Sequence, residues 1–109
     1  MFYINPVEIR HHRGDSLKLS FDILEGNNLD NIEYTIKSSD EIYFAILEPN
    51  QPWELALVKK KVVGENSIIL DPKDTMCIYP GLYYYQFKLR VSPTEVYTLC
   101  PRTPFWIQE

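Results

Sequence analysis

Two adjacent histidines and two separate cysteines are the side chains in this sequence best suited to bind a metal ion or to act as nucleophiles. His11 and His12 are neighbours, whereas Cys77 and Cys100 stand singly, without the close spacing of zinc ligands. Adjacent strand residues point to opposite faces, so the two imidazoles are not expected to share a metal ion. A cysteine and a histidine also need a nucleophile turn or an oxyanion loop to form a catalytic pair, and no motif for either is present. We expect no metal, no cofactor and no enzymatic activity.

The remaining residue types support the same expectation. Gly14, Gly26, Gly64 and Gly81 are far apart, so the chain has no glycine-rich phosphate loop. The carboxylates are scattered over predicted turns and polar strand faces, and no acid–base pair can be assigned among them.

The tripeptide Arg13-Gly14-Asp15 matches the sequence that cell-adhesion receptors bind. A match this short arises often by chance. We expect a structural role instead, in which Gly14 adopts an unusual backbone angle and Asp15 opens the following strand.

The charge balance argues against a nucleic-acid partner. The chain has 11 basic and 15 acidic residues and a net charge of −4, whereas nucleic-acid binders usually carry a basic surplus. The single basic run, Lys59–Lys61, is short and is typical of an edge strand, where charge discourages stray pairing.

The beginning of the sequence lacks a basic and apolar leader, and no window approaches the ~18 apolar residues of a membrane helix. We expect synthesis in a cytoplasm, no membrane partner, and Cys77 and Cys100 as free thiols.

Aromatic residues give the clearest indication of a binding surface. The strand predicted over Ile42–Leu47 is apolar on both faces, so it is either central or covered on its outer side. Large rings at several other positions would suit the centre of a protein interface, although they could equally cover the core. The candidate interface residues are Tyr43, Ala45, Leu47, Trp53, Tyr84, Tyr97 and Trp106.

These side chains must be positioned by strands. The 109 residues suit one domain spanning 1–109, and β-branched and aromatic residues make up about a third of them, while alanine occurs only at Ala45 and Ala56. Alternation predicts strands throughout, the strongest with Tyr83, Tyr85, Phe87, Leu89 and Val91 on one face.

Two further segments complete the expected fold. Trp53–Val63 is predicted to be a strand with Leu55 and Leu57 on one side. Asp71 and Pro72 predict a short helical turn near residues 72–78, crossing between sheets. The expected architecture is all-β: an antiparallel β-sandwich of about seven to eight strands.

Several stretches, in their order along the chain, resemble a family of small Ig-like β-sandwich proteins of tailed bacteriophages and prophages, similar to the N-terminal domain of baseplate upper proteins. The matching stretches are Arg13–Ser16, Glu41–Phe44, Leu70–Thr75 with Pro80–Tyr85, and Val96–Leu99 with Phe105–Ile107. The resemblance implies a non-enzymatic virion structural protein, made in the host bacterial cytoplasm. It would act as an assembly or adaptor module of the tail or baseplate, in homo- or hetero-oligomeric contact with other virion proteins.

The resemblance leaves alternatives open. The chain could decorate a capsid or form a head fibre, or it could be a carbohydrate-binding module that stacks sugars on Trp53 or Trp106, although a small-molecule ligand is not our expectation. If it is an assembly module, we expect residues 1–8 to include an N-terminal arm (Met1–Pro6) that adds a strand to a neighbour. The Phe105–Ile107 segment is the other candidate.

Overall fold

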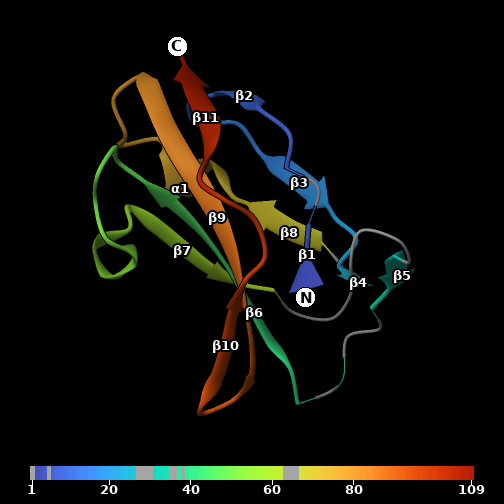
Figure 1. Ribbon diagram of the computed structural model, residues 1–109. Helices are drawn as coiled ribbons and strands as arrows, with labels where there is room; N and C mark the ends of the chain where they lie inside the picture. The colour runs from blue at the N-terminus through green and yellow to red at the C-terminus, as the bar shows by residue number, and fades with distance from the viewer. Residues whose placement is uncertain (1, 5, 27–30, 35–36, 38, 63–66) are drawn as a thin grey trace.

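The protein is all-β in its computed structural model, which describes residues 2–4, 6–26, 31–34, 37, 39–62 and 67–109 (Figure 1). Two short helices interrupt the strands: the 3-10 helix η1 (Trp53–Leu55) and the α-helix α1 (Pro72–Thr75). The strands are β1 Phe2–Tyr3, β2 Ile9–His12, β3 Leu17–Ser20, β4 Leu24–Gly26, β5 Asn31–Glu33, β6 Glu41–Leu47, β7 Val58–Lys61, β8 Ser67–Leu70, β9 Gly81–Ser92, β10 Glu95–Thr98 and β11 Thr103–Gln108. These eleven strands in the described residues exceed the expected seven or eight, because short strands such as β1 and β4 carry too little alternation to be recognised in sequence.

The largest sheet has the strand order β2-β11-β9-β6-β7, with β10 also paired to β9. β9 is its longest strand, and Tyr85, Phe87 and Leu89 are buried on one of its faces. Tyr83 and Val91 pack against the same core from partly exposed positions. The predicted alternation over Tyr83–Val91 is therefore confirmed.

The expectation of a purely antiparallel fold was wrong at one edge of this sheet. β2 runs parallel to β11, with Ile9 opposite Phe105 and His11 opposite Ile107. Parallel neighbours need a long connection between them, and here nearly the whole chain supplies it. The backbone N–H of Arg13 extends the pairing by donating to the carbonyl of Gln108 at 2.6 Å.

A second sheet of β3 and β8 packs against one face of the six-stranded sheet, which we call the inner face. The rings of Phe21 and Phe87 meet across this interface with centroids 4.9 Å apart. The largest side chains that are fully buried in the resulting core include Phe44, Phe105 and Leu89.

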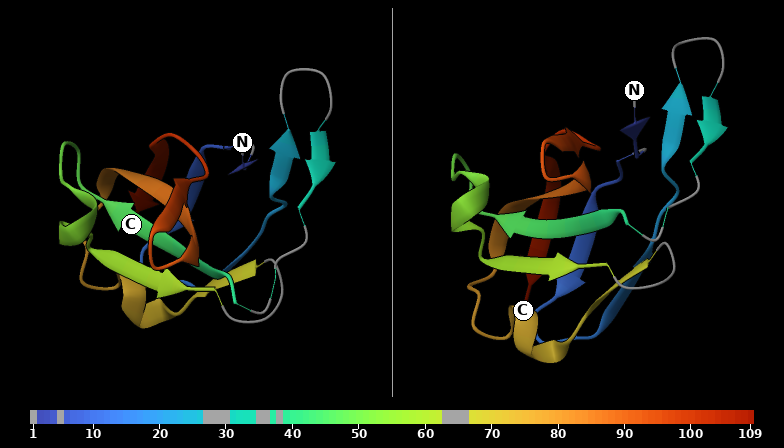
Figure 2. Two further views of the ribbon diagram at one scale, coloured as in Figure 1. Left: turned by 60° about the horizontal axis from the view of Figure 1, so that its bottom comes forward. Right: turned by 90° about the horizontal axis from the view of Figure 1, so that it is seen from below.

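The N-terminal residues are part of the fold. β1 pairs with β4, which pairs with β5, in a third sheet that stands to one side of the body (Figure 2). Ile4 is buried, its N–H donates to the carbonyl of Leu99 at 2.7 Å, and the Phe2 ring lies against Tyr34 and Tyr97. Residues 2–4 therefore do not form the free arm that we expected within residues 1–8. Met1 and Asn5 lie outside the described residues.

The predicted helical turn is confirmed as α1, which connects β8 of the second sheet to β9 of the first. The Asp74 carboxylate accepts a hydrogen bond from the Asp71 backbone N–H at 2.7 Å and fixes the first turn. Lys60 Nζ lies 2.8 Å from the same carboxylate, so this ion pair joins β7 to the helix. Gly14 has a φ of +81°, as expected for the turn, and its N–H donates to Thr75 Oγ1 at 2.9 Å.

The prediction of one strand over Trp53–Val63 was wrong in its first half. Pro52 is extended and starts η1, where the N–H of Leu55 donates to the Pro52 carbonyl at 3.0 Å. Within residues 53–62 only Val58–Lys61 is a strand, and it ends the sheet order as the lysine run predicted; Val63 lies outside the described residues. The alternating pattern failed here because the turn forms its hydrogen bonds locally.

Candidate functional site

The outer face of the six-stranded sheet, opposite β3 and β8, gathers most of the predicted interface residues. Strand register places Trp106 beside Leu82, Tyr84 beside Leu47, and Tyr43 beside Lys88 on this face. Of the seven candidates, six lie on or over it: Tyr43, Ala45, Leu47, Trp53, Tyr84 and Trp106. Among the described residues, no second sheet covers this face.

Trp53 of η1 lies over the centre of the outer face. Its ring centroid is 5.3 Å from Lys59 Nζ on β7 and 4.8 Å from Lys88 Nζ on β9. Ala45 of β6 lies between those two strands and pairs directly with Lys59. The ring therefore lies above Ala45, in contact with two cations.

Ala45 and Leu47 are not available to a partner, because each has an exposed fraction of 0%. Trp53 covers Ala45, and Leu47 is buried where β6 leads into the connection to η1, beside Tyr84. The two-faced apolar strand is thus explained within the chain: its outer side is covered by a local turn. Tyr97 does not lie on the outer face. It pairs with Leu89, whose side chain faces inward, and the Tyr97 ring packs on Phe2.

Tyr43, Tyr84 and Trp106 remain half-buried on the outer face. Trp106 Nε1 donates a hydrogen bond to Glu8, and the Arg10 guanidinium lies 5.2 Å from its ring centroid. The Tyr43 hydroxyl donates to the Glu41 carboxylate, which raises the pKa of Tyr43 and lowers the pKa of Glu41. The Tyr43 and Trp106 rings are held by polar contacts that leave part of their area open.

The grouping of four basic side chains on this face was not predicted from the sequence, which indicated only the lysine run of an edge strand. Lys59 and Lys61 of β7 and Lys88 and Arg90 of β9 all project outward on either side of β6. We call these four residues the cation cluster. None of them forms an ion pair with a residue in the described part of the chain. The overall charge of −4 gives no indication of a basic cluster. The four residues are brought together by the register of β6 with β7 and with β9.

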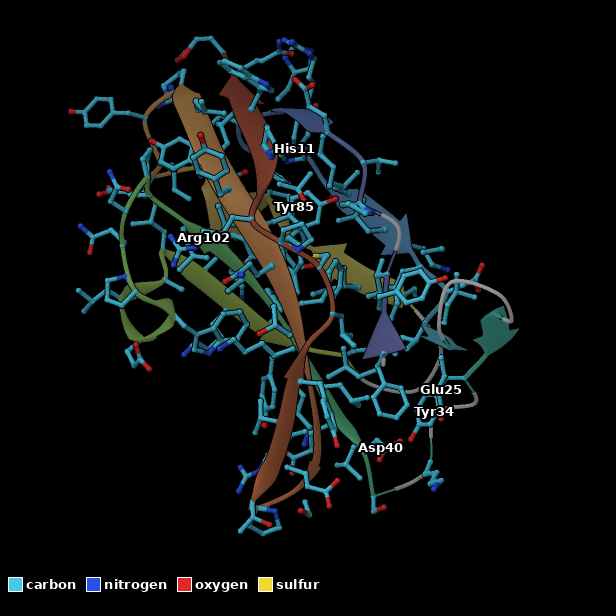
Figure 3. The ribbon with its side chains drawn as sticks, in the orientation of Figure 1. His11, Glu25, Tyr34, Asp40, Tyr85 and Arg102 are labelled. Carbon is cyan, nitrogen blue, oxygen red and sulfur yellow. The ribbon has the colours of Figure 1, made fainter. Side chains whose placement is uncertain are left out.

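The outer face continues into an open recess beside Tyr84, with a volume of about 600 Å³. Residues 49–52 form one wall and Arg102 the other, and the Arg102 guanidinium donates to the carbonyl of Gln51 (Figure 3). Asn50 turns the chain here with a φ of +64°. Arg102 adds a further positive charge at the rim.

The histidines and cysteines differ in their exposure to solvent. His11 is buried and His12 is exposed, as expected for neighbours on one strand. Cys77 is exposed and Cys100 buried, both as free thiols, and burial raises the pKa of Cys100, which disfavours the nucleophilic thiolate. Among the described residues, no three His, Cys, Asp or Glu side chains are grouped closely enough to hold a metal ion.

His11 predicts a pH-dependent stability. Its exposed fraction is 5%, its Nε2 atom lacks a hydrogen-bond partner among the described residues, and burial lowers its pKa against the opposing effect of Asp15. The unfolded chain takes up the proton near pH 6.5, so the free energy of unfolding should fall as the pH drops below that value, by at most about 1.4 kcal/mol per pH unit.

Urea unfolding between pH 7.5 and 5 would measure this effect. His11→Gln should flatten the pH dependence, whereas His12→Gln, at the exposed neighbour, should preserve it. An unchanged slope in His11→Gln would contradict the assignment.

A polar cluster stabilises the side sheet. The Tyr34 hydroxyl donates to Asp40 Oδ2 at 2.5 Å, close to Glu25 (Figure 3). Burial, together with Asp40, raises the pKa of Tyr34 to about 12, so its phenol stays protonated. The backbone N–H of Lys37 donates to the same Asp40 oxygen at 2.9 Å, which makes the cluster structural.

An apolar cavity of about 320 Å³ lies between the N-terminal segment and the connection from β3 to β4. The Tyr85 hydroxyl holds one wall, since it donates to the Val7 carbonyl at 2.5 Å and accepts from the Val7 N–H at 3.0 Å. Ile9, Phe21 and Leu24 supply apolar lining.

No protein-family model, curated protein or solved structure matches this chain. Neither helix in the described ranges is long and apolar enough to cross a membrane.

Proposed function

We propose that this protein is a non-catalytic structural protein of a phage or prophage virion, an assembly or adaptor module of the tail or baseplate with an Ig-like β-sandwich fold. The observation that carries the proposal is the outer face, where Tyr43, Tyr84 and Trp106 gather on a sheet surface that no second sheet covers among the described residues. Half-buried aromatic residues on a rigid sheet suit a protein interface, because they add contact area at little entropic cost.

The placement in a virion rests on the sequence resemblance. The Ig-like arrangement is supported by two sheets that face each other across one core. β11 lies between β2 and β9, so Phe105–Ile107 has no free edge to offer, and contact through the outer face replaces strand donation in this proposal.

Carbohydrate binding is less well supported. Trp53 is in contact with Lys59 and Lys88, and Trp106 with Arg10. A sugar that stacks on either ring would have to compete with these cations.

Density-gradient purification of particles from a producing lysate tests the proposal. The protein should co-sediment with intact particles, and separated tails and heads should distinguish the tail or baseplate from a capsid-decorating or head-fibre position. Protein found only in the soluble fraction would contradict the proposal.

Tyr84→Ala should reduce the amount of protein in the particles by about tenfold, the effect of losing roughly 1.4 kcal/mol at an interface. Tyr79→Ala is the matched control, because Tyr79 is highly exposed and lies outside the outer face. Equal incorporation of both variants would exclude Tyr84 from the interface.

A further inference from the structure

The cation cluster has a regular geometry. Lys59 and Lys61 are two residues apart on β7, and Lys88 and Arg90 are two residues apart on β9. Alternate residues of a strand repeat about every 7 Å, and strands separated by one neighbour are about 10 Å apart. The four charges therefore form two rows that flank β6.

These charges are unbalanced although the chain as a whole is acidic. Arg10, Lys60 and Arg13 each have a carboxylate partner, whereas no ion pair involves the cation cluster within the described residues. Glu41, opposite Arg90, is an acidic residue of β6 at the end of these rows. Four cations beside one carboxylate, with no ion pair among the described residues, leave an electrostatic surplus that an acidic partner would complete.

We propose that the outer face binds an extended acidic segment of a protein partner, which runs along one row of the cation cluster with its carboxylates beside those cations, because the Trp53 ring occupies the space between Lys59 and Lys88. This inference rests on the proposed function and specifies the chemistry of the partner. Carboxylates on alternate residues of an extended chain also repeat about every 7 Å, which matches the spacing within each row. The exposed parts of Tyr43 and Tyr84 supply apolar contact beside the charges.

A protein segment fits this face better than a nucleic acid does. The net charge of −4 repels an acidic peptide and a nucleic acid alike, so the local contacts of the outer face decide between them. The central ring, Trp53, is engaged by Lys59 and Lys88 instead of lying open for base stacking.

The probe is an acetylated and amidated (Glu-Thr)4 peptide titrated into the full chain, observed by backbone amide NMR shifts. We expect shifts confined to β6, β7 and β9 and a binding constant that weakens with added salt. A (Gln-Thr)4 peptide should produce no saturable shift.

Charge reversal gives the decisive comparison. Lys59→Glu/Lys88→Glu should weaken (Glu-Thr)4 binding by about tenfold or more. Lys18→Glu/Lys73→Glu has the same net charge but alters exposed lysines outside this face, so it should change affinity by less than about twofold. Amide spectra report whether each variant is folded, and Lys59→Gln/Lys88→Gln replaces the first variant if it is not.

Equal weakening in both charge-reversed variants would overturn the inference, as would the absence of saturable shifts in the wild-type protein. Tighter binding of an oligothymidylate of equal charge would overturn it in favour of nucleic acid. If (Glu-Thr)4 binds as expected but the protein does not co-sediment with particles, the proposed function fails and this inference stands. The reverse result would leave the virion role intact and remove the acidic partner.

Discussion

Phe44→Ala is expected to destabilise the protein by about 3–5 kcal/mol, the cost of removing a large aromatic side chain from a packed core. Phe44 is fully buried, and its ring centroid lies 5.8 Å from that of Tyr85 and 5.1 Å from that of Phe87. It therefore connects β6 to the core face of β9. A domain of this size has about 5–15 kcal/mol of stability in total, so much of it would be lost.

Urea denaturation and thermal unfolding would measure the loss, and the melting temperature should fall by about 12 °C or more. Tyr43→Ala is the matched control, since it removes a ring from the adjacent residue on the half-buried outer face. We expect that control to cost about 1 kcal/mol. Similar losses for both variants would mean that the two faces of β6 contribute equally to the core, contrary to the structure.

Trp53→Ala is expected to cost about 2 kcal/mol, because it uncovers Ala45 and removes two cation–π contacts. Trp53→Phe keeps a ring at the same position and should recover about half of that loss. Both variants should be measured by urea unfolding at constant salt concentration.

A double-mutant cycle isolates the cationic contribution. Lys88→Met keeps the aliphatic side chain and removes the charge, and its coupling to Trp53→Ala should be about 0.5–1 kcal/mol. Strictly additive losses would show that Trp53 acts by covering Ala45 alone.

The structure agrees with the sequence where local pattern decides the outcome. β9 follows from unbroken alternation, α1 from Asp71 and Pro72, and the Gly14 turn from the need for a positive φ. In each case, the residues that specify the element are neighbours in the chain.

The remaining features depend on contacts between distant residues. The residues of neither segment indicate that Ile9 pairs in parallel with Phe105. An antiparallel fold was therefore the expectation from the sequence. Ala45 had the pattern of an interface residue because the covering ring of Trp53 comes from a turn that had been predicted as a strand. The cation cluster required the register of three strands.

The pairing of β2 with β11 also bears on how the chain folds during synthesis. The ion pair between Arg13 and Glu109 at this edge joins residues 96 apart, and closing so long a loop costs about 4 kcal/mol of chain entropy. β2 leaves the ribosome well before its partner strand β11. The first half of β9 also lacks its β11 neighbour until then. The nascent chain therefore carries an open sheet edge, which closes only when residues 103–108 dock between two strands that are already in place.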